Sequence, residues 1–183
     1  MTNEKYVVFN PEGGLGKIIA STAVVRNIEL TYPDRKIIVV TPWPEVFLNN
    51  ESSHPYFYRD YIHNRDTIVL KGEPYFCTDH LYHKQHLVQT WCEFHKLKFD
   101  GNVMPELYFT PNEIESVRDS INTDKPILLL QTNGGMYAGN PKPYCWTRDL
   151  PHAQAQHLVN ELVKDYYIVH VTRPECKPLE GTQ

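Results

Sequence analysis

The first forty residues contain two short apolar runs separated by one long, mostly apolar segment. The run KYVVFN, residues 5–10, is rich in β-branched and aromatic residues and predicts a buried strand. Residues 16–30 predict a helix, which ends before Pro33 because a proline disfavours helical geometry in the preceding residue. The run KIIVVT, residues 36–41, predicts a second buried strand. This order predicts a βαβ unit and, as the fold class, an α/β protein with a Rossmann-like, doubly wound parallel sheet.

The pattern from residue 50 to residue 97 predicts one further strand and one helix. The run DTIVL, residues 66–70, predicts the strand, whereas the aromatic segment before it predicts loop with short pieces of sheet. Residues 84–97 predict an amphipathic helix that faces the core. Its apolar stripe consists of Leu87, Val88, Trp91, Cys92 and Phe94.

A capping box marks the beginning of the next helix. Thr110 is the expected N-cap, Pro111 occupies the first helical position and Glu113 lies three residues after the cap. In this arrangement the threonine and the glutamate side chains each accept a hydrogen bond from the other residue's backbone N–H. We therefore expect a helix from about residue 111 to residue 121.

The last third of the chain repeats the order of the beginning. A strand over residues 127–132 is followed by a Gly/Pro-rich loop over 133–143, a helix over 151–165 and a strand over 166–172. We expect a Rossmann-like domain over residues 1–122 and the start of a second, incomplete Rossmann-like βαβ piece over residues 123–183.

Composition and charge limit the kinds of molecule that we expect the protein to bind. Asp and Glu number 22 against 18 Lys and Arg, which gives a net charge of −4 and argues against a nucleic-acid partner. The four cysteines form no CxxC pair and no signal peptide precedes Tyr6, so we expect a cytoplasmic protein with reduced thiols. No apolar run approaches the roughly 18 residues of a membrane span. A small-molecule partner is expected.

The stretch between the first strand and the first helix is a candidate anion site. Gly13, Gly14 and Gly16 allow the backbone to approach a ligand closely, and the helix beginning offers unpaired N–H groups. Lys17 adds a positive charge in the first helical turn, where an anion would offset its conflict with the helix dipole. The alternative, a tight turn with a solvated lysine, fits the glycines equally well.

Two nucleotide-binding motifs do not fit this loop. A P-loop needs Ser or Thr directly after its lysine to bind magnesium, but Ile18 occupies that position, and Pro11 replaces the first glycine. A dinucleotide site needs the spacing G-x-G-x-x-G, which GGLG lacks. A nucleophilic serine or cysteine is also unsupported, because the chain contains no G-x-S-x-G elbow.

Several stretches in order along the chain resemble the ADP-heptose:lipopolysaccharide heptosyltransferase family. They are GGLGKIIASTAVVRNIELTYPDRKIIVV, PELYFTPNE, ILLLQTNGG, WTRDLPHAQAQHLVNEL and YYIVHV. The resemblance implies a GT-B arrangement, with an acceptor-side N-terminal domain and a C-terminal domain that handles a nucleotide-sugar. It implies transfer of a sugar from a nucleotide-diphosphate donor to a hydroxyl acceptor of glycan or lipopolysaccharide type. It implies no cofactor and no metal.

This chain departs from the family pattern first at the position of the catalytic base. The family carries an aspartate directly after the last glycine, taken to be the base, where this chain has Lys17. Glu12 is the nearest carboxylate on the loop and our candidate catalytic base, although a loop glutamate can also be a solvated charge. Lys17 could instead offset the charge of a departing diphosphate.

The second departure concerns length. The second domain stops after one strand, helix and strand, whereas the donor is usually held by later elements of that domain. The chain could be a fragment, a relative that binds without catalysing, or a subunit that completes its sheet in a homo-oligomer. A protein that retains the fold for binding or assembly is the alternative function.

The loop after the strand at residues 127–132 carries further candidates for phosphate binding. The expected backbone donors are Asn133, Gly134 and Gly135, and the expected cations are Lys142 and Arg148, with Arg173 on the same rim. A long surface loop packed through its aromatic residues explains the same pattern.

The histidines His80, His83 and His86 recur every three residues. No zinc signature accompanies them, so we expect them to be polar side chains near the acceptor or on the surface.

Overall fold

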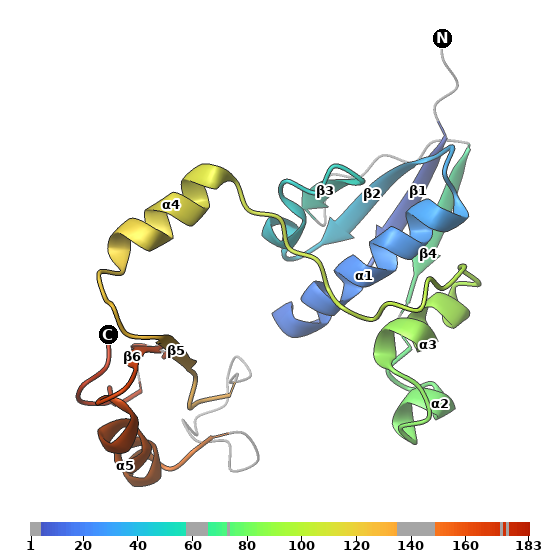
Figure 1. The fold of residues 1–183 in the computed structure, drawn as a ribbon. Coiled ribbons are helices and arrows are strands. Elements are labelled where there is room, and N and C mark those ends of the chain that lie inside the picture. Colours follow the sequence, from blue (N-terminus) through green and yellow to red (C-terminus); the bar gives the residue numbers. More distant parts are fainter. Residues whose placement is uncertain (1–4, 58–65, 73, 135–148, 173, 175) are drawn as a thin grey trace. The chain divides into compact units, whose positions relative to one another are not determined.

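The computed structural model describes residues 5–57, 66–72, 74–134, 149–172, 174 and 176–183 (Figure 1). The chain divides into two compact units, Met1–Glu115 and Ser116–Gln183. Each unit is built around its own parallel sheet. In the described residues, no helix is long and apolar enough to cross a membrane.

The sheet of the first unit has four parallel strands in the order β3-β2-β1-β4. The strands are β1 (Tyr6–Asn10), β2 (Lys36–Thr41), β3 (Ser53–Phe57) and β4 (Thr67–Lys71). β1 lies between β2 and β4, and its last residue, Asn10, pairs with Lys71. The Rossmann-like parallel sheet predicted from the apolar runs is therefore confirmed.

Helices α1 (Leu15–Thr31) and α3 (Leu87–Phe94) pack with one face of this sheet in a single core. Alternate residues of β1, Val7 and Phe9, point into that core, as the period of two in a strand requires. Trp91 of α3 is fully buried and meets Phe9 edge to face, with 5.7 Å between the ring centroids. The short helix η1 (Pro44–Phe47) contributes the buried Phe47.

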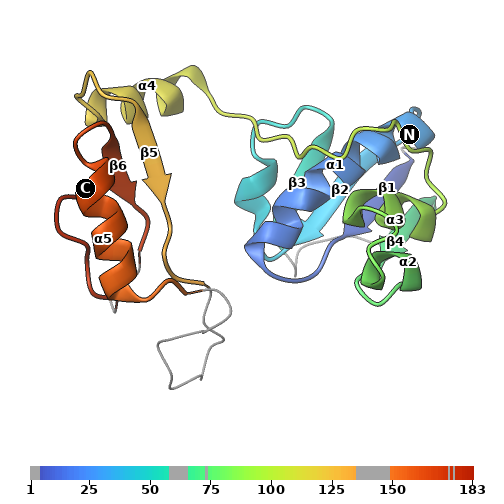
Figure 2. The same ribbon diagram turned by 60° about the horizontal axis from the view of Figure 1, so that its bottom comes forward.

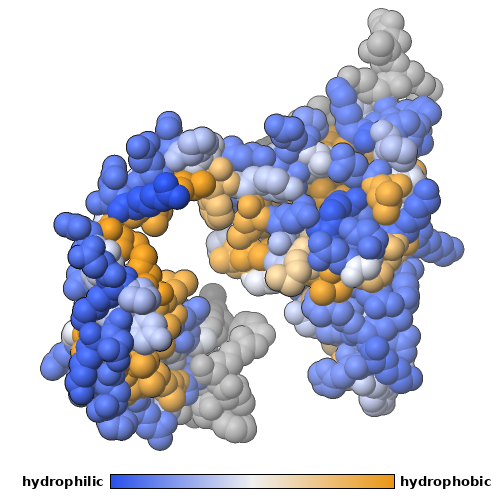
Figure 3. Space-filling view, viewed as in Figure 1, coloured by the Kyte–Doolittle hydropathy of each residue, from blue (hydrophilic) through white to orange (hydrophobic). Residues whose placement is uncertain are grey.

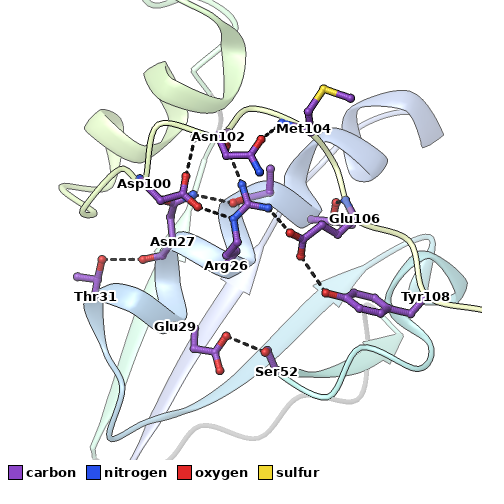
Figure 4. Close-up of polar contacts among 12 residues, drawn as sticks. Arg26, Asn27, Glu29, Thr31, Ser52, Asp100, Asn102, Met104, Glu106 and Tyr108 are labelled. Atoms are coloured by element: carbon purple, nitrogen blue, oxygen red, sulfur yellow. Dashed lines mark hydrogen bonds and ion pairs between the residues drawn. The ribbon is translucent and has the colours of Figure 1, made fainter.

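Polar side chains of α1 hold residues 98–106 against the helix, as Figure 4 shows for several of them. Their oxygens accept hydrogen bonds from backbone N–H groups of that segment. The bonds join Thr22 to Glu106, Asn27 to Asp100 and Thr31 to Lys98, with N···O distances of 2.9, 2.8 and 2.9 Å. Because these N–H groups belong to no helix or sheet, the side chains of α1 take the place of regular secondary structure as their hydrogen-bond partners.

Arg26 adds charge to the same attachment (Figure 4). Its guanidinium forms ion pairs with Asp100 and Glu106 and donates to the carbonyl of Asn102 at 2.7 Å. The two carboxylates and the guanidinium are each less than one third exposed. The polar break at residues 26 and 27 in the apolar helix is therefore an attachment point for the chain that leaves α3.

The helix predicted over residues 84–97 is shorter than expected. The structure has α2 (Thr78–Leu81) and α3 (Leu87–Phe94), separated at His83, whose φ of 55° lies in the left-handed region. The His86 ring accepts a hydrogen bond from the backbone N–H of Val88 and so caps α3. Phe94, placed by the periodicity on the buried stripe, is 47% exposed because α3 ends there.

The capping box at the next helix is confirmed. Helix α4 (Pro111–Ser120) begins after Thr110, whose hydroxyl accepts from the Glu113 N–H at 3.2 Å. The Glu113 carboxylate accepts from the Thr110 N–H at 2.6 Å, and this bond lowers the pKa of Glu113. Every residue of α4 is exposed, so its beginning is determined by local capping rather than by burial.

The second unit has the two parallel strands β5 (Ile127–Leu130) and β6 (Tyr167–His170), connected through α5 (His152–Leu162). Figure 2 shows α5 beside both strands. Ala155 and Val159 of α5 pack on Ile168 and Leu179. This strand, helix and strand follow the predicted order.

The other face of the β5–β6 sheet is uncovered in the described residues. Ile127 and Leu129, which alternate with the residues facing α5, are 55% and 68% exposed. Figure 3 shows a band of apolar surface on this unit. At the free edge of β6, the backbone of Gln183 exchanges hydrogen bonds with His170 and Ile168. The apolar face is therefore the part of this unit that a further surface would cover.

Candidate functional site at the glycine loop

The glycine loop, residues 11–14 between β1 and α1, lies where the strand order of the first sheet reverses. The chain runs from β1 outward to β2 and β3 and then returns to the other side of β1 as β4. In open parallel sheets, ligands bind outside the carboxyl ends of the strands at this reversal. The loops that follow Asn10 and Lys71, which are register partners, both leave this edge.

The backbone of the loop has the conformation that its glycines permit. Gly13 has φ +118°, in the region that favours glycine, and Gly14 is the N-cap of α1 with φ −76° and ψ 163°. The Gly14 carbonyl accepts from the N–H groups of Lys17 and Ile18 at 3.0 and 3.2 Å. No side chain caps α1 and no acidic residue lies in its first turn, so the positive end of the helix dipole is not offset locally.

Lys17 is folded back over this loop rather than extended. A Cβ atom on Gly13 would lie 2.5 Å from Cε and 2.6 Å from Nζ of Lys17. The ammonium lies over the ring of Tyr75, 4.5 Å from the ring centroid. Partial burial lowers the pKa of Lys17, and the negative charge of Glu12 opposes this shift. Lys17 is therefore a partly desolvated cation at the carboxyl ends of β1 and β4.

Tyr75 is a site residue that the sequence reasoning did not identify. It lies 58 positions after Lys17 in the chain, and only the pairing of β1 with β4 brings the two together. The sequence contains one indication of this role: Tyr75 lies a few residues after the strand predicted over residues 66–70. Loops that follow neighbouring parallel strands leave the sheet at the same end, where ligands bind.

The three histidines have separate environments. The His80 ring meets Tyr75 edge to face at 5.4 Å, His83 occupies a left-handed backbone position and His86 caps α3. Within the described residues, no group of three or more His, Cys, Asp or Glu side chains is arranged to hold a metal ion.

Behind the loop, several buried polar atoms lack a hydrogen-bond partner in the described structure: Asn10 Oδ1, Trp91 Nε1 and His95 Nε2. Burial lowers the pKa of His95 to about 4, although a hydrogen bond to the Gly72 backbone opposes this shift. Cys92 is fully buried and its pKa is raised to about 12 by desolvation, so it is a thiol rather than a nucleophilic thiolate.

The second unit carries a buried polar cluster at the carboxyl ends of β5 and β6. Thr132 Oγ1 donates to Asn133 Oδ1 at 3.0 Å and lies 2.9 Å from His170 Nε2. Since a hydroxyl has one proton, His170 donates to Thr132 from Nε2. Burial and the nearby His152 lower the pKa of His170 and favour this neutral form. The Gly134 N–H, an expected phosphate donor, donates to the buried Asp149 carboxylate at 2.6 Å.

The remaining candidates of that loop, Gly135, Lys142 and Arg148, lie outside the described residues, as does Arg173. Glu12 and the glycines of residues 13, 14 and 16 lie together at the edge of the first sheet with Lys17. Thr132, Asp149 and His170, like Tyr75, were not identified as site residues from the sequence.

Comparison with solved structures identifies the fold. The crystal structure of a family 9 glycosyltransferase from Veillonella parvula matches with a TM-score of 0.63 at 14% sequence identity, over 98% of this chain and 69% of that one. The chain shares the fold of this glycosyltransferase. ADP-heptose LPS heptosyltransferase II from E. coli matches over 90% of this chain and 63% of that one, with 14% identity and a TM-score of 0.46. No protein family profile and no curated protein match the sequence.

The resemblance inferred from the sequence is thus confirmed at the level of the fold. Within this glycosyltransferase fold, the candidate site of the first unit consists of the glycine loop, Lys17 and Tyr75. In place of the aspartate expected from the family pattern it presents a cation held against an aromatic ring.

Gly13→Ala should lower the free energy of unfolding by about 1–2 kcal/mol, because alanine is strained at a positive φ. The new Cβ should also displace the Lys17 side chain. Gly16→Ala is the matched control, since its Cβ would meet no atom within 4 Å and alanine favours a helical position. Urea unfolding followed by circular dichroism measures both variants, and an equal loss in the two would contradict the role assigned to Gly13.

Proposed function

We propose that this chain is a glycosyltransferase, or part of one, that transfers a sugar from a nucleotide-diphosphate donor to a hydroxyl acceptor. The observation that carries the proposal is a partly desolvated lysine at the strand-order reversal of a glycosyltransferase fold. The acceptor, a glycan or lipopolysaccharide-like molecule, would bind at the first unit and the nucleotide-sugar at the second. The fold similarity and the family resemblance support this division.

In the proposed reaction the acceptor oxygen attacks the anomeric carbon of the donor sugar. Its proton passes to a base, and the bond between the sugar and the diphosphate breaks. Glu12 is the proposed base, because it is the carboxylate of the loop and its charge acts on Lys17. Lys17 would stabilise the negative charge of the departing diphosphate. Asn133, Gly135, Lys142 and Arg148 are the proposed phosphate contacts of the second unit, whereas the Gly134 N–H already donates to Asp149.

Thermal shifts with ADP-, GDP- and UDP-sugars test the proposal. A ligand at one hundred times its Kd should stabilise the chain by about 2.7 kcal/mol. Lys17→Met keeps most of the side-chain stem but removes the charge, and should weaken binding about 10- to 100-fold, since a hydrogen bond to a charged group contributes about 1.5–3 kcal/mol. Lys98→Met, at an exposed lysine, is the matched control. Release of nucleoside diphosphate in the presence of acceptor then measures transfer.

A non-catalytic binding or assembly protein is the second candidate. Lys17 in place of an aspartate and the uncovered apolar face of the β5–β6 sheet favour it. Such a protein would show no thermal shift with any nucleotide-sugar. Its apolar face would instead be covered by another protein surface, such as a second copy of the chain, which sedimentation would detect as a dimer. A shift that Lys17→Met removes would argue against this candidate.

A further inference from the structure

We propose that Tyr75 is the positioning residue for the Lys17 ammonium and that His80 holds Tyr75 in place. The use of this arrangement in sugar transfer rests on the proposed function. Lys17 Nζ lies 4.5 Å from the Tyr75 ring centroid, within the distance at which the negative face of an aromatic ring attracts a cation. Both residues belong to the first unit.

The folded position of Lys17 depends on the glycine at position 13. The end of the lysine side chain occupies the space that a Cβ atom at position 13 would fill, with Cε at 2.5 Å and Nζ at 2.6 Å. Gly13 therefore permits the positive φ of the turn and also leaves room for the cation. The ammonium lies between this backbone and the Tyr75 ring.

Tyr75 is itself held by its neighbours rather than by the core. It is 38% exposed, but the preceding Pro74 is buried, and the Pro74 carbonyl accepts from the Cys77 N–H at 2.9 Å in the turn that leads into α2. His80 of α2 then meets the Tyr75 ring at an interplanar angle of 86°. An edge-to-face contact of this kind is favourable and orients the ring.

A lysine ordered in this way is prepared for an anion. A free lysine loses rotamer entropy when it binds a ligand, whereas Lys17 is already held by a ring that does not neutralise its charge. A cation oriented in advance stabilises developing negative charge without reorganisation. Lys17 supplies the charge for a diphosphate group and Tyr75 determines where that charge lies.

The first test is NMR of the full chain labelled with ¹³C-lysine, with Lys17→Met to identify the Lys17 signal. In the native protein, the ring current of Tyr75 should shift the Lys17 Cε protons upfield from the ordinary lysine position. Tyr75→Phe should keep this shift, Tyr75→Leu should remove it and His80→Ala should reduce it. An ordinary Lys17 position in the native chain, or one that Tyr75→Leu leaves unchanged, would overturn the proposal.

The second test follows the same signal during titration with inorganic pyrophosphate. Tyr75→Leu should bind about two- to five-fold more weakly than the native chain and Tyr75→Phe like it, as expected for loss of one partly exposed cation–π contact. Equal affinities in the three proteins, or a Lys17 signal that pyrophosphate does not move, would overturn the role of Tyr75. Failure of every nucleotide-sugar to bind would contradict the proposed function but not the ring-current result, so the two failures are distinguishable.

Discussion

Trp91→Ala should lower the free energy of unfolding by about 3–5 kcal/mol, the range for truncating a buried aromatic side chain. Trp91 of α3 is fully buried in the core with residues of α1 and the sheet, and it is the largest side chain of that core. Its loss removes the edge-to-face contact with Phe9 and leaves a cavity that the strands of a sheet cannot close. Urea unfolding followed by circular dichroism measures the change.

Trp91→Phe separates the packing of the ring from its polar group. The indole N–H has no hydrogen-bond partner in the described structure, so phenylalanine loses volume but no hydrogen bond. We expect less than half of the alanine effect. A phenylalanine variant as unstable as the alanine variant would show that the indole N–H has a partner, such as a buried water molecule.

The stability of the first unit should fall by about 2–3 kcal/mol as the pH decreases from 6.5 to 4, because of His95. Burial lowers the pKa of His95 in the folded chain to about 4, from 6.5 in the unfolded chain. Between these values the unfolded state binds a proton that the folded state does not, so acid favours unfolding. Above pH 6.5 His95 is neutral in both states, and below pH 4 it is charged in both. Urea unfolding at a series of pH values measures this dependence.

His95→Phe is the matched variant for this prediction. Phenylalanine keeps a ring against Phe9 and Phe94 but cannot titrate. The free energy of unfolding of the variant at pH 8 measures the effect of the substitution itself. Between pH 6.5 and 4 this free energy should fall by about 2–3 kcal/mol less in the variant than in the native chain. Because the pKa of His170 in the second unit is also lowered, some slope should remain. Identical curves for the native and variant chains would contradict the assignment to His95.

The elements that the sequence predicted well are those whose signals are local. The apolar runs of β1, β2 and β4 matched the observed strands, and the capping box at Thr110 marked the beginning of α4 although that helix buries no residue. The helix predicted over residues 84–97 was too long because periodicity does not show the cap formed by the His86 ring or the left-handed backbone at Lys96, with φ 56°.

The candidate site was predicted in part for the same reason. Gly13 and Lys17 are close together in the chain, so the sequence alone predicted a glycine turn followed by a helix with a lysine in its first turn. Tyr75 was not, because its contact with Lys17 depends on the pairing of β1 with β4, two neighbouring strands that are far apart in the sequence. The polar attachment of residues 98–106 to Arg26 and Asn27 was missed likewise, because its partners are far apart in the sequence.

The sequence by itself determined the strand, helix and strand order at each end of the chain, the Rossmann-like class of the first unit and the glycine turn that begins α1, because hydrophobic period, proline and glycine act within a few residues. Only the tertiary structure decided that Lys17 lies folded over Gly13 against Tyr75 and that His95 is partly buried with a lowered pKa. Those outcomes depend on which segments the sheet brings side by side, and burial and electrostatic environment exist only once it has done so.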